Sequence, residues 1–378
     1  VANTFTNLTT VSDGTLLLAK TSGGAVSNLT VNGGGSRLIA PVVRYAAGIS
    51  PASPMISGTL TINSSANASG QLDFNGATDT VANVTINTAT ATFDNRPIVN
   101  TGSGGVLTIN SLNITPVDQF VSTLDSGSGT LKLGGSLNFT SANANAQAKI
   151  TGNLDLNGTR IFNVKDPGTS RAPVYDLGIN AIISNGSLIM TNTGRLYLGG
   201  MNTYTGQTLV GDGVAAGTVI VGAGASIAAS ANVMVNSNAT LQLDHAQGLG
   251  SNAVVTIESF GGSSAIGKIN LNFSGATQRV ARLYFEPSPS PIVSARPGVT
   301  WGASGSGAQY TNQYFSGPGV LMASGGDLQV ANRAVSDLII FSGRPSLEVV
   351  EALGGSGETE GSIRGSLDWF TRHQEADG

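Results

Sequence analysis

Four aspartates lie in or beside strand-like segments of this chain, and they could form a catalytic pair. Asp73, Asp79, Asp155 and Asp244 are widely spaced along the sequence. Two carboxyl groups that cleave a glycosidic bond must lie within about 5 to 9.5 Å of each other. Asp73 and Asp155 occupy the same place in a short repeated unit, which favours a structural, outward-facing role. A polysaccharide-degrading β-helix enzyme is therefore kept only as a minor alternative.

The chain has two histidines, His245 and His373. A histidine that acts as a general base needs a positioned partner and a substrate cleft. For His245, one adjacent aspartate, Asp244, indicates neither a positioned partner nor a substrate cleft. His373 lies in a charged segment. We interpret His245 as a solvent-facing turn residue, and we expect that the protein is not an enzyme.

Composition argues against bound metals, cofactors and nucleic acid. The chain has no cysteine, which excludes disulfides and thiolate metal sites. It has no G-G-x-G-x-D array and no D-x-[DN]-x-[DN]-G loop for calcium, and its glycines lack the lysine of a phosphate-binding loop. Lys and Arg total 18 and the net charge is −4, so a nucleic-acid partner is not expected.

A six-residue unit recurs through the first half of the chain. Its order is small residue, any residue, apolar, polar, apolar, Asn. Because side chains alternate between the faces of a strand, the two apolar residues face one side. Asn tolerates left-handed turn conformations, and stacked asparagines can form ladders. The unit predicts short strands with asparagine at the corners, at 58–63, 70–75, 82–87, 105–110 and 152–157.

Composition agrees with a repetitive β-structure. Gly is 52 of 378 residues, charged residues are 11% and mean hydropathy is +0.12. Apolar residues sit regularly between the glycines, which favours a solenoid over disorder. The uncharged stretch 213–236 is long enough to span a bilayer. Its glycines and its alternation at Thr218–Val221 indicate stacked strands instead, so no membrane span is expected.

One segment is similar to a known repeat. The run Gly200-Met-Asn-Thr-Tyr-Thr-Gly206 is followed by Thr208-Leu-Val210 and then by Gly217-Thr-Val-Ile-Val221. This order resembles the autotransporter-associated β-strand repeat, and the resemblance covers roughly residues 10 to 324. It implies a parallel β-helix built outside the cell, and it does not imply one activity. Prolines 287, 289, 291 and 297 replace the acidic-Gly turn of that family's closing module.

The expected fold is therefore an all-β, single-chain parallel β-helix (β-solenoid), taken as right-handed. It should occupy residues 1–324. Residues 325–378 should form a short non-solenoid C-terminal tail with helix-like segments at 346–353 and 362–373. The apolar residues of this tail are candidates for docking on a neighbouring subunit: Leu347, Val350, Leu353, Ile363, Leu367, Trp369 and Phe370.

Five aromatic residues leave two interpretations. Stacking on sugars is one. In the favoured interpretation, Tyr204 fills a corner of the coil. The other four aromatic residues then cover the C-terminal end of the solenoid: Trp301, Tyr310, Tyr314 and Phe315.

The first functional hypothesis is a secreted structural protein, a subunit of an extracellular filament or bacterial cell-surface layer. Solenoid ends expose unpaired strand edges that can pair with other chains. The expected partner is a further copy of the chain, engaged through the solenoid ends and the tail. The start at Val1 has no basic n-region and no apolar core, so we expect a mature terminus without a signal peptide.

The main alternative is a surface adhesin or passenger stalk. In that case three proline-containing loops would contact glycan or host protein: 41–54, 166–173 and 287–297.

Overall fold

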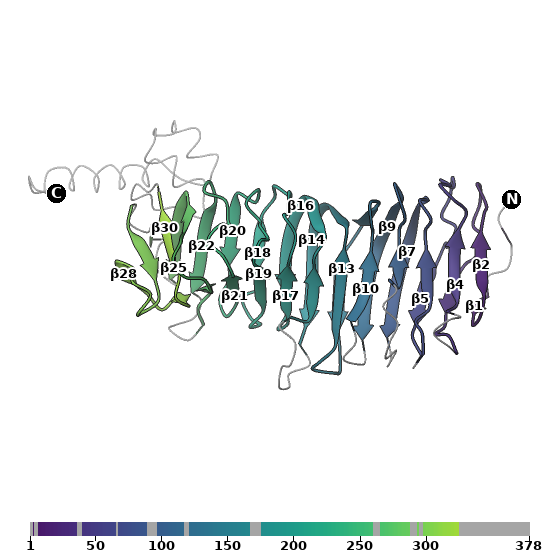
Figure 1. Ribbon diagram of the computed structural model, residues 1–378, viewed down its shortest axis with the longest axis horizontal. Coiled ribbons are helices and arrows are strands. Elements are labelled where there is room, and N and C mark those ends of the chain that lie inside the picture. Colours follow the sequence, from purple (N-terminus) through teal and green to yellow (C-terminus); the bar gives the residue numbers. More distant parts are fainter. Residues whose placement is uncertain are drawn as a thin grey trace, which may run out of the picture. The chain divides into compact units, whose positions relative to one another are not determined.

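The computed structural model describes residues 3, 7–35, 40–65, 67–88, 97–116, 121–166, 175–259, 265–287, 293–294 and 298–324. These residues form thirty strands and no helix, which confirms the prediction of an all-β chain. Figure 1 shows successive strands of the solenoid side by side, from purple to green.

The strands belong to three sheets. The spatial order of the first, 14-stranded sheet is β1 (Thr9–Val11), β3 (Leu29–Val31), β5 (Thr59–Asn63), β7 (Thr78–Thr88), β9 (Val106–Pro116), β11 (Thr130–Leu133), β14 (Asn153–Lys165), β16 (Ile182–Thr191), β18 (Thr208–Val210), β20 (Asn232–Val235), β22 (Val254–Ser259), β25 (Arg282–Pro287) and β26 (Val293–Ser294), with β12 (Leu137–Thr140) paired to β9 and β14.

The order of the second, 12-stranded sheet is β2 (Thr15–Leu18), β4 (Val42–Tyr45), β6 (Gln71–Asp73), β8 (Val99–Asn100), β10 (Val121–Asp125), β13 (Gln147–Thr151), β15 (Leu177–Ile179), β17 (Arg195–Leu198), β19 (Thr218–Val221), β21 (Thr240–Leu243), β23 (Lys268–Leu271) and β29 (Phe315–Ser316). The 4-stranded sheet has the order β24 (Thr277–Val280), β30 (Val320–Ala323), β27 (Thr300–Gly302) and β28 (Tyr310–Thr311).

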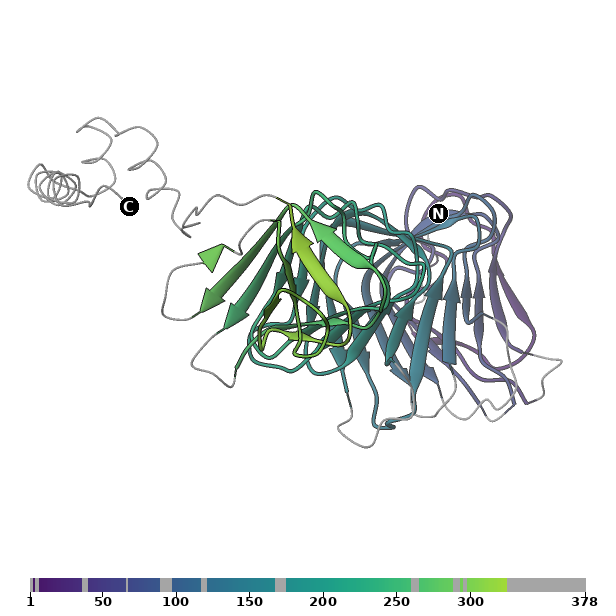
Figure 2. The same cartoon turned by 60° about the vertical axis from the view of Figure 1, so that its left-hand side comes forward.

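The chain alternates between the two large sheets, so each coil stacks on the one before it. Long strands bend within a coil: the first half of β9 pairs with β11 and its second half pairs with β12. Each such coil therefore has three strand-bearing sides. Pairing between successive coils of the large sheets is parallel, which confirms the predicted β-solenoid (Figures 1 and 2).

The interior follows from the alternation of side chains along each strand. In β5 the residues Leu60 and Ile62 are buried, while their neighbours are partly exposed. The parallel register stacks Leu60 on Val84, and the same row continues through Leu112. Buried apolar residues form one cluster that runs from Val11 to Ala323. Burial of this apolar surface is the main stabilising contribution to the stack.

Two asparagine ladders run along the outside of the first sheet, and the one through Asn63 and Asn87 uses the predicted corner position. Asn138 Nδ2 donates to Asn113 Oδ1 at 3.0 Å, and Asn163 Nδ2 donates to Asn138 Oδ1 at 3.2 Å. Asn192 extends this ladder through a bond of 3.1 Å to Asn163. A second ladder links Asn32, Asn63 and Asn87 in successive coils.

Other asparagines of the repeated unit supply the predicted turn conformation. Asn75 and Asn157 have φ of 49° and 52°, in the left-handed region. Asn63 and Asn87 belong to a ladder instead. The same sequence position therefore serves two purposes, which depend on the corner where it falls.

Two further predictions meet a clear outcome. The stretch 213–236 contains the strands β19 and β20, as predicted. Within the described ranges no helix has the length and apolar character to cross a bilayer. The prediction of a loop over 41–54 is wrong in part, because β4 occupies Val42–Tyr45. Pro41 lies just before that strand, where its missing N–H is tolerated. The tail 325–378 and most of the other two predicted loops lie outside the described residues.

Replacing Asn138 by Ala should interrupt the ladder and leave Asn113 Oδ1 and Asn163 Nδ2 without their partners. We expect a loss of about 1 to 2 kcal/mol in the free energy of unfolding, measured with urea. Asn83→Ala is the matched control, because Asn83 is exposed in β7 and has no side-chain hydrogen bond within the described part of the chain. Equal losses in the two variants would contradict a stabilising ladder.

Candidate functional site

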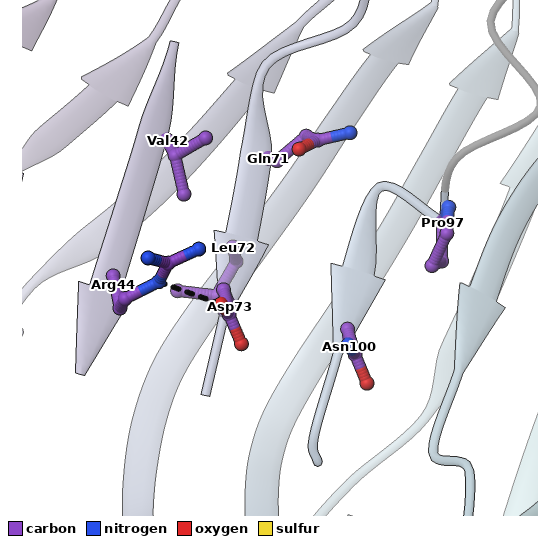
Figure 3. A pocket seen from close by; sticks show the side chains of 7 residues that line it. All are labelled: Val42, Arg44, Gln71, Leu72, Asp73, Pro97 and Asn100. Atoms are coloured by element: carbon purple, nitrogen blue, oxygen red, sulfur yellow. Dashed lines mark hydrogen bonds and ion pairs between the residues drawn. The ribbon is translucent and has the colours of Figure 1, made fainter. Parts of the chain in front are cut away.

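A hollow of about 200 Å³ lies on the outer face of the second sheet, over β4, β6 and β8. Polar and apolar groups both contribute to its lining. Figure 3 shows the seven residues that form it: Val42, Arg44, Gln71, Leu72, Asp73, Pro97 and Asn100.

The register of the sheet brings the polar residues of the hollow together. Arg44 is opposite Asp73, and Asp73 is opposite Asn100 in the next strand. Neighbouring strands lie about 4.8 Å apart, so these three outward side chains form a short row along the solenoid axis. Figure 3 shows the guanidinium of Arg44 directed toward Asp73.

Hydrogen bonds hold these side chains in position. Arg44 Nε donates to Asp73 Oδ2 at 2.7 Å. Asp73 Oδ1 accepts the N–H of Asn75 at 3.1 Å, and Asn100 Oδ1 accepts the N–H of Gly102 at 3.0 Å. The side chain of Arg44 is 49% exposed, so the ion pair contributes at most about 1 kcal/mol to stability. Its main effect is to orient the groups that face the hollow.

The aspartates predicted as carboxylate candidates do not come together. Asp73 faces outward on β6, whereas Asp79 is buried in β7. Asp79 Oδ2 accepts Tyr45 Oη at 3.1 Å and the N–H of Met55 at 2.9 Å. Burial raises the pKa of the Asp79 carboxyl, an effect that the bonds from Met55, Thr80 and Tyr45 partly oppose. Asp79 thus links its own strand to Tyr45 and Met55, which precede it in the chain, through buried hydrogen bonds.

Asp73 and Asp155 are both partly exposed and make the same local hydrogen bond, as their shared place in the repeated unit predicts. Each accepts the N–H of the residue two positions on, Asn75 or Asn157. Asp73 lies in the second sheet, however, while Asp155 lies in the first. The repeated unit is therefore a local turn motif that occurs on different sides of the coil. Both oxygens of Asp73 are engaged in hydrogen bonds. Hydrogen bonds from the hollow to a ligand would therefore come from its other polar side chains.

The N-T-Y-T-G segment is a structural corner. Tyr204 is buried, and its Oη lies 2.7 Å from Thr208 Oγ1. Thr208 Oγ1 in turn donates to Ser230 Oγ at 2.9 Å in the next coil. Asn202 Nδ2 donates to the carbonyls of Gly200 and Ser226, at 2.9 and 3.0 Å. The prediction that Tyr204 fills a corner of the coil is confirmed.

Three of the four C-terminal aromatic residues pack against Phe285. Tyr314 and Phe315 are buried against Phe285, with ring centroids 5.2 and 6.3 Å from it. Trp301 stacks on Tyr310 at 5.1 Å, and Tyr310 is 40% exposed. Trp301, with its ring centroid 5.2 Å from that of Phe285, packs beside Tyr314 and Phe315, as the interpretation of a covered C-terminal end expects. Tyr310 is the more exposed member of the set.

His245 differs from the prediction of a solvent-facing residue. It is half-buried, and its Nδ1 is enclosed without a hydrogen-bond partner. Asp244 accepts bonds from Gln242 and Asn272. Throughout the described ranges, no group of three or more His, Cys, Asp or Glu residues is placed to hold a metal ion.

Sequence reasoning did not identify the hollow. Val42 and Arg44 fell inside a predicted loop, and no local pattern pairs Arg44 with Asp73, which is 29 residues away. His373 lies outside the described residues. So do the predicted assembly residues Leu347, Val350, Leu353, Ile363, Leu367, Trp369 and Phe370.

Comparisons with protein-family models, with curated proteins and with solved structures found no match. The resemblance to the autotransporter-associated repeat therefore stays a prediction. Function has to be argued from the residues and their geometry.

The buried carboxyl of Asp79 predicts a pH-dependent stability. Because its pKa in the folded state is raised above the ordinary 3.8, its contribution is complete below about pH 3.8 and is lost as the pH rises through the folded-state pKa. Asp79→Asn does not titrate. Relative to the parent chain, its free energy of unfolding should rise across this window by about 1.4 kcal/mol per pH unit.

Urea unfolding between acid and neutral pH measures this difference. Asp155→Asn, which removes an outward-facing carboxyl from the same sheet, controls for the loss of one acidic group. A difference between Asp79→Asn and the parent that stays constant with pH would contradict the assignment.

Proposed function

We propose that this chain is a secreted structural protein, a stiff solenoid that serves as a subunit of an extracellular filament or bacterial cell-surface layer. The supporting observation is the uninterrupted stack of coils with one apolar interior from Val11 to Ala323. A solenoid of this kind transmits force along its axis, because each coil is bonded to both neighbours.

Two features of the stack favour a mechanical role. Backbone ladders join successive coils on every strand-bearing side, and the asparagine ladders add side-chain bonds in the same direction. The outer surface also carries few charges, since charged residues are 11% of the chain. Weak electrostatic repulsion favours the close packing of identical chains.

Assembly is assigned to the solenoid ends and to the segment 325–378. That segment contains apolar residues at spacings suited to docking, including Trp369 and Phe370. An extracellular location agrees with the absence of cysteine and with the resemblance to the autotransporter-associated repeat. The partner is then a further copy of the same chain.

Electron microscopy of the purified protein, with and without residues 325–378, tests this proposal. The full chain should form filaments or sheets. The truncated chain should remain monomeric and keep a β-rich circular dichroism spectrum, because the apolar cluster ends at Ala323.

A matched pair of variants separates apolar docking from a general effect of the tail. Trp369→Ser with Phe370→Ser should abolish assembly, whereas Thr371→Ser with Arg372→Ser should leave it intact. Unchanged assembly of the truncated chain would overturn the proposal.

A second candidate is adhesion, in which the solenoid is a surface stalk that binds glycan or host protein. The hollow over β4, β6 and β8 favours this role. Within the described part of the chain, Arg44 Nη1 and Nη2 and the Gln71 amide have no partner and face solvent beside it. These groups are placed to bind hydroxyls or carbonyls of a ligand.

A further inference from the structure

We infer that the hollow is the first part of a binding row for a neutral, unbranched polysaccharide that lies along the solenoid axis. This inference rests on the second candidate function, adhesion, and specifies its ligand. The row consists of outward-facing polar side chains that the register of the second sheet aligns.

Five residues make up this row, which we call the outer polar row: Arg44, Asp73, Asn100, Asp125 and Thr151. Each is opposite the next in successive strands β4, β6, β8, β10 and β13. With neighbouring strands about 4.8 Å apart, the row is about 20 Å long. A regular array of this kind suits a ligand that repeats along the same direction.

Turns at the corner of each coil hold the row in place before any ligand binds. Asp73, Asn100 and Asp125 each accept the backbone N–H two residues on, at 3.1, 3.0 and 2.9 Å. Thr151 Oγ1 donates to Asp125 Oδ1 at 2.8 Å. Side chains that are already ordered lose less conformational entropy on binding.

The turns at Asn100 and Asp125 leave part of the side chain available, whereas both oxygens of Asp73 are engaged. Among the described residues, Asn100 Nδ2 and Asp125 Oδ2 have no partner, and neither do Arg44 Nη1 and Nη2. The Gln71 amide, opposite Val42, supplies a further donor and acceptor beside the row. The row therefore presents both donors and acceptors, which suits sugar hydroxyls because a hydroxyl both donates and accepts.

The charges of the row select against acidic sugars. Arg44 is paired with Asp73, so its positive charge is already compensated. Asp125 adds a negative charge that repels a uronate or sulfate. Val42 and Pro97 line the hollow with apolar surface, against which the C–H face of a pyranose ring can pack. The favoured ligand is thus an uncharged polyhydroxy chain.

Calorimetry with defined oligosaccharides tests the inference on the full chain. The probes are hexasaccharides of cellulose, mannan and xylan, their disaccharides, and an acidic oligogalacturonate of equal length. At least one neutral hexasaccharide should bind, at least about tenfold more tightly than its disaccharide and than the oligogalacturonate.

Two variants place that binding on the row. Asn100→Asp keeps the acceptor for the Gly102 N–H and replaces the outward N–H donor by a charged oxygen, and Arg44→Ala removes the guanidinium. Each should weaken binding about tenfold. Arg279→Ala is the matched control, because Arg279 is an exposed arginine of β24, outside the row.

Three outcomes would overturn the inference: no binding of any neutral hexasaccharide, preferred binding of the acidic oligomer, or equal binding by the two row variants and Arg279→Ala. Filament assembly of the same variants is scored separately by electron microscopy. A row variant that loses glycan binding but still forms filaments shows that the two properties are separate, because assembly is assigned to other residues. Failure of the binding inference is therefore distinguishable from failure of the assembly proposal.

Discussion

Parallel backbone pairing between successive coils is the interaction on which the rest of this structure depends. A buried peptide group must be hydrogen-bonded, and the coil meets this requirement by pairing each strand with the strand above and below it. The pairing fixes the register, and the register stacks equivalent residues in rows, such as Leu60, Val84 and Leu112. A residue at one position therefore shares its environment with its neighbours in adjacent coils.

This stacking decides which polar groups the interior can contain. Asp79 takes an inward position in a row that continues through Leu107, and it is retained because Tyr45 and Met55 donate to it. The Tyr204, Thr208 and Ser230 hydroxyls form a similar closed set at another corner. Unpaired polar groups in these places would be costly. Polar residues inside the stack thus join coils to one another.

The same stacking creates order on the outside. Asparagines that follow the apolar pair of a strand, or lie between its two apolar residues, meet their counterparts in the next coil and form ladders. On the second sheet it aligns Arg44, Asp73 and Asn100 beside a hollow. A mechanical role and a binding role therefore have one physical origin, which is the repetition of one coil along an axis.

Local alternation in the sequence was sufficient to predict the strands and the corner asparagines, because these depend on residues a few positions apart. Register between coils was not predictable. Coil length varies, with Arg44 and Asp73 29 residues apart but Asp125 and Thr151 26 apart, so no fixed spacing identifies neighbours. For the same reason Asp73 and Asp155, alike in sequence, lie in different sheets. Only the tertiary structure decided which polar residues meet, because those contacts are set by backbone pairing between distant segments.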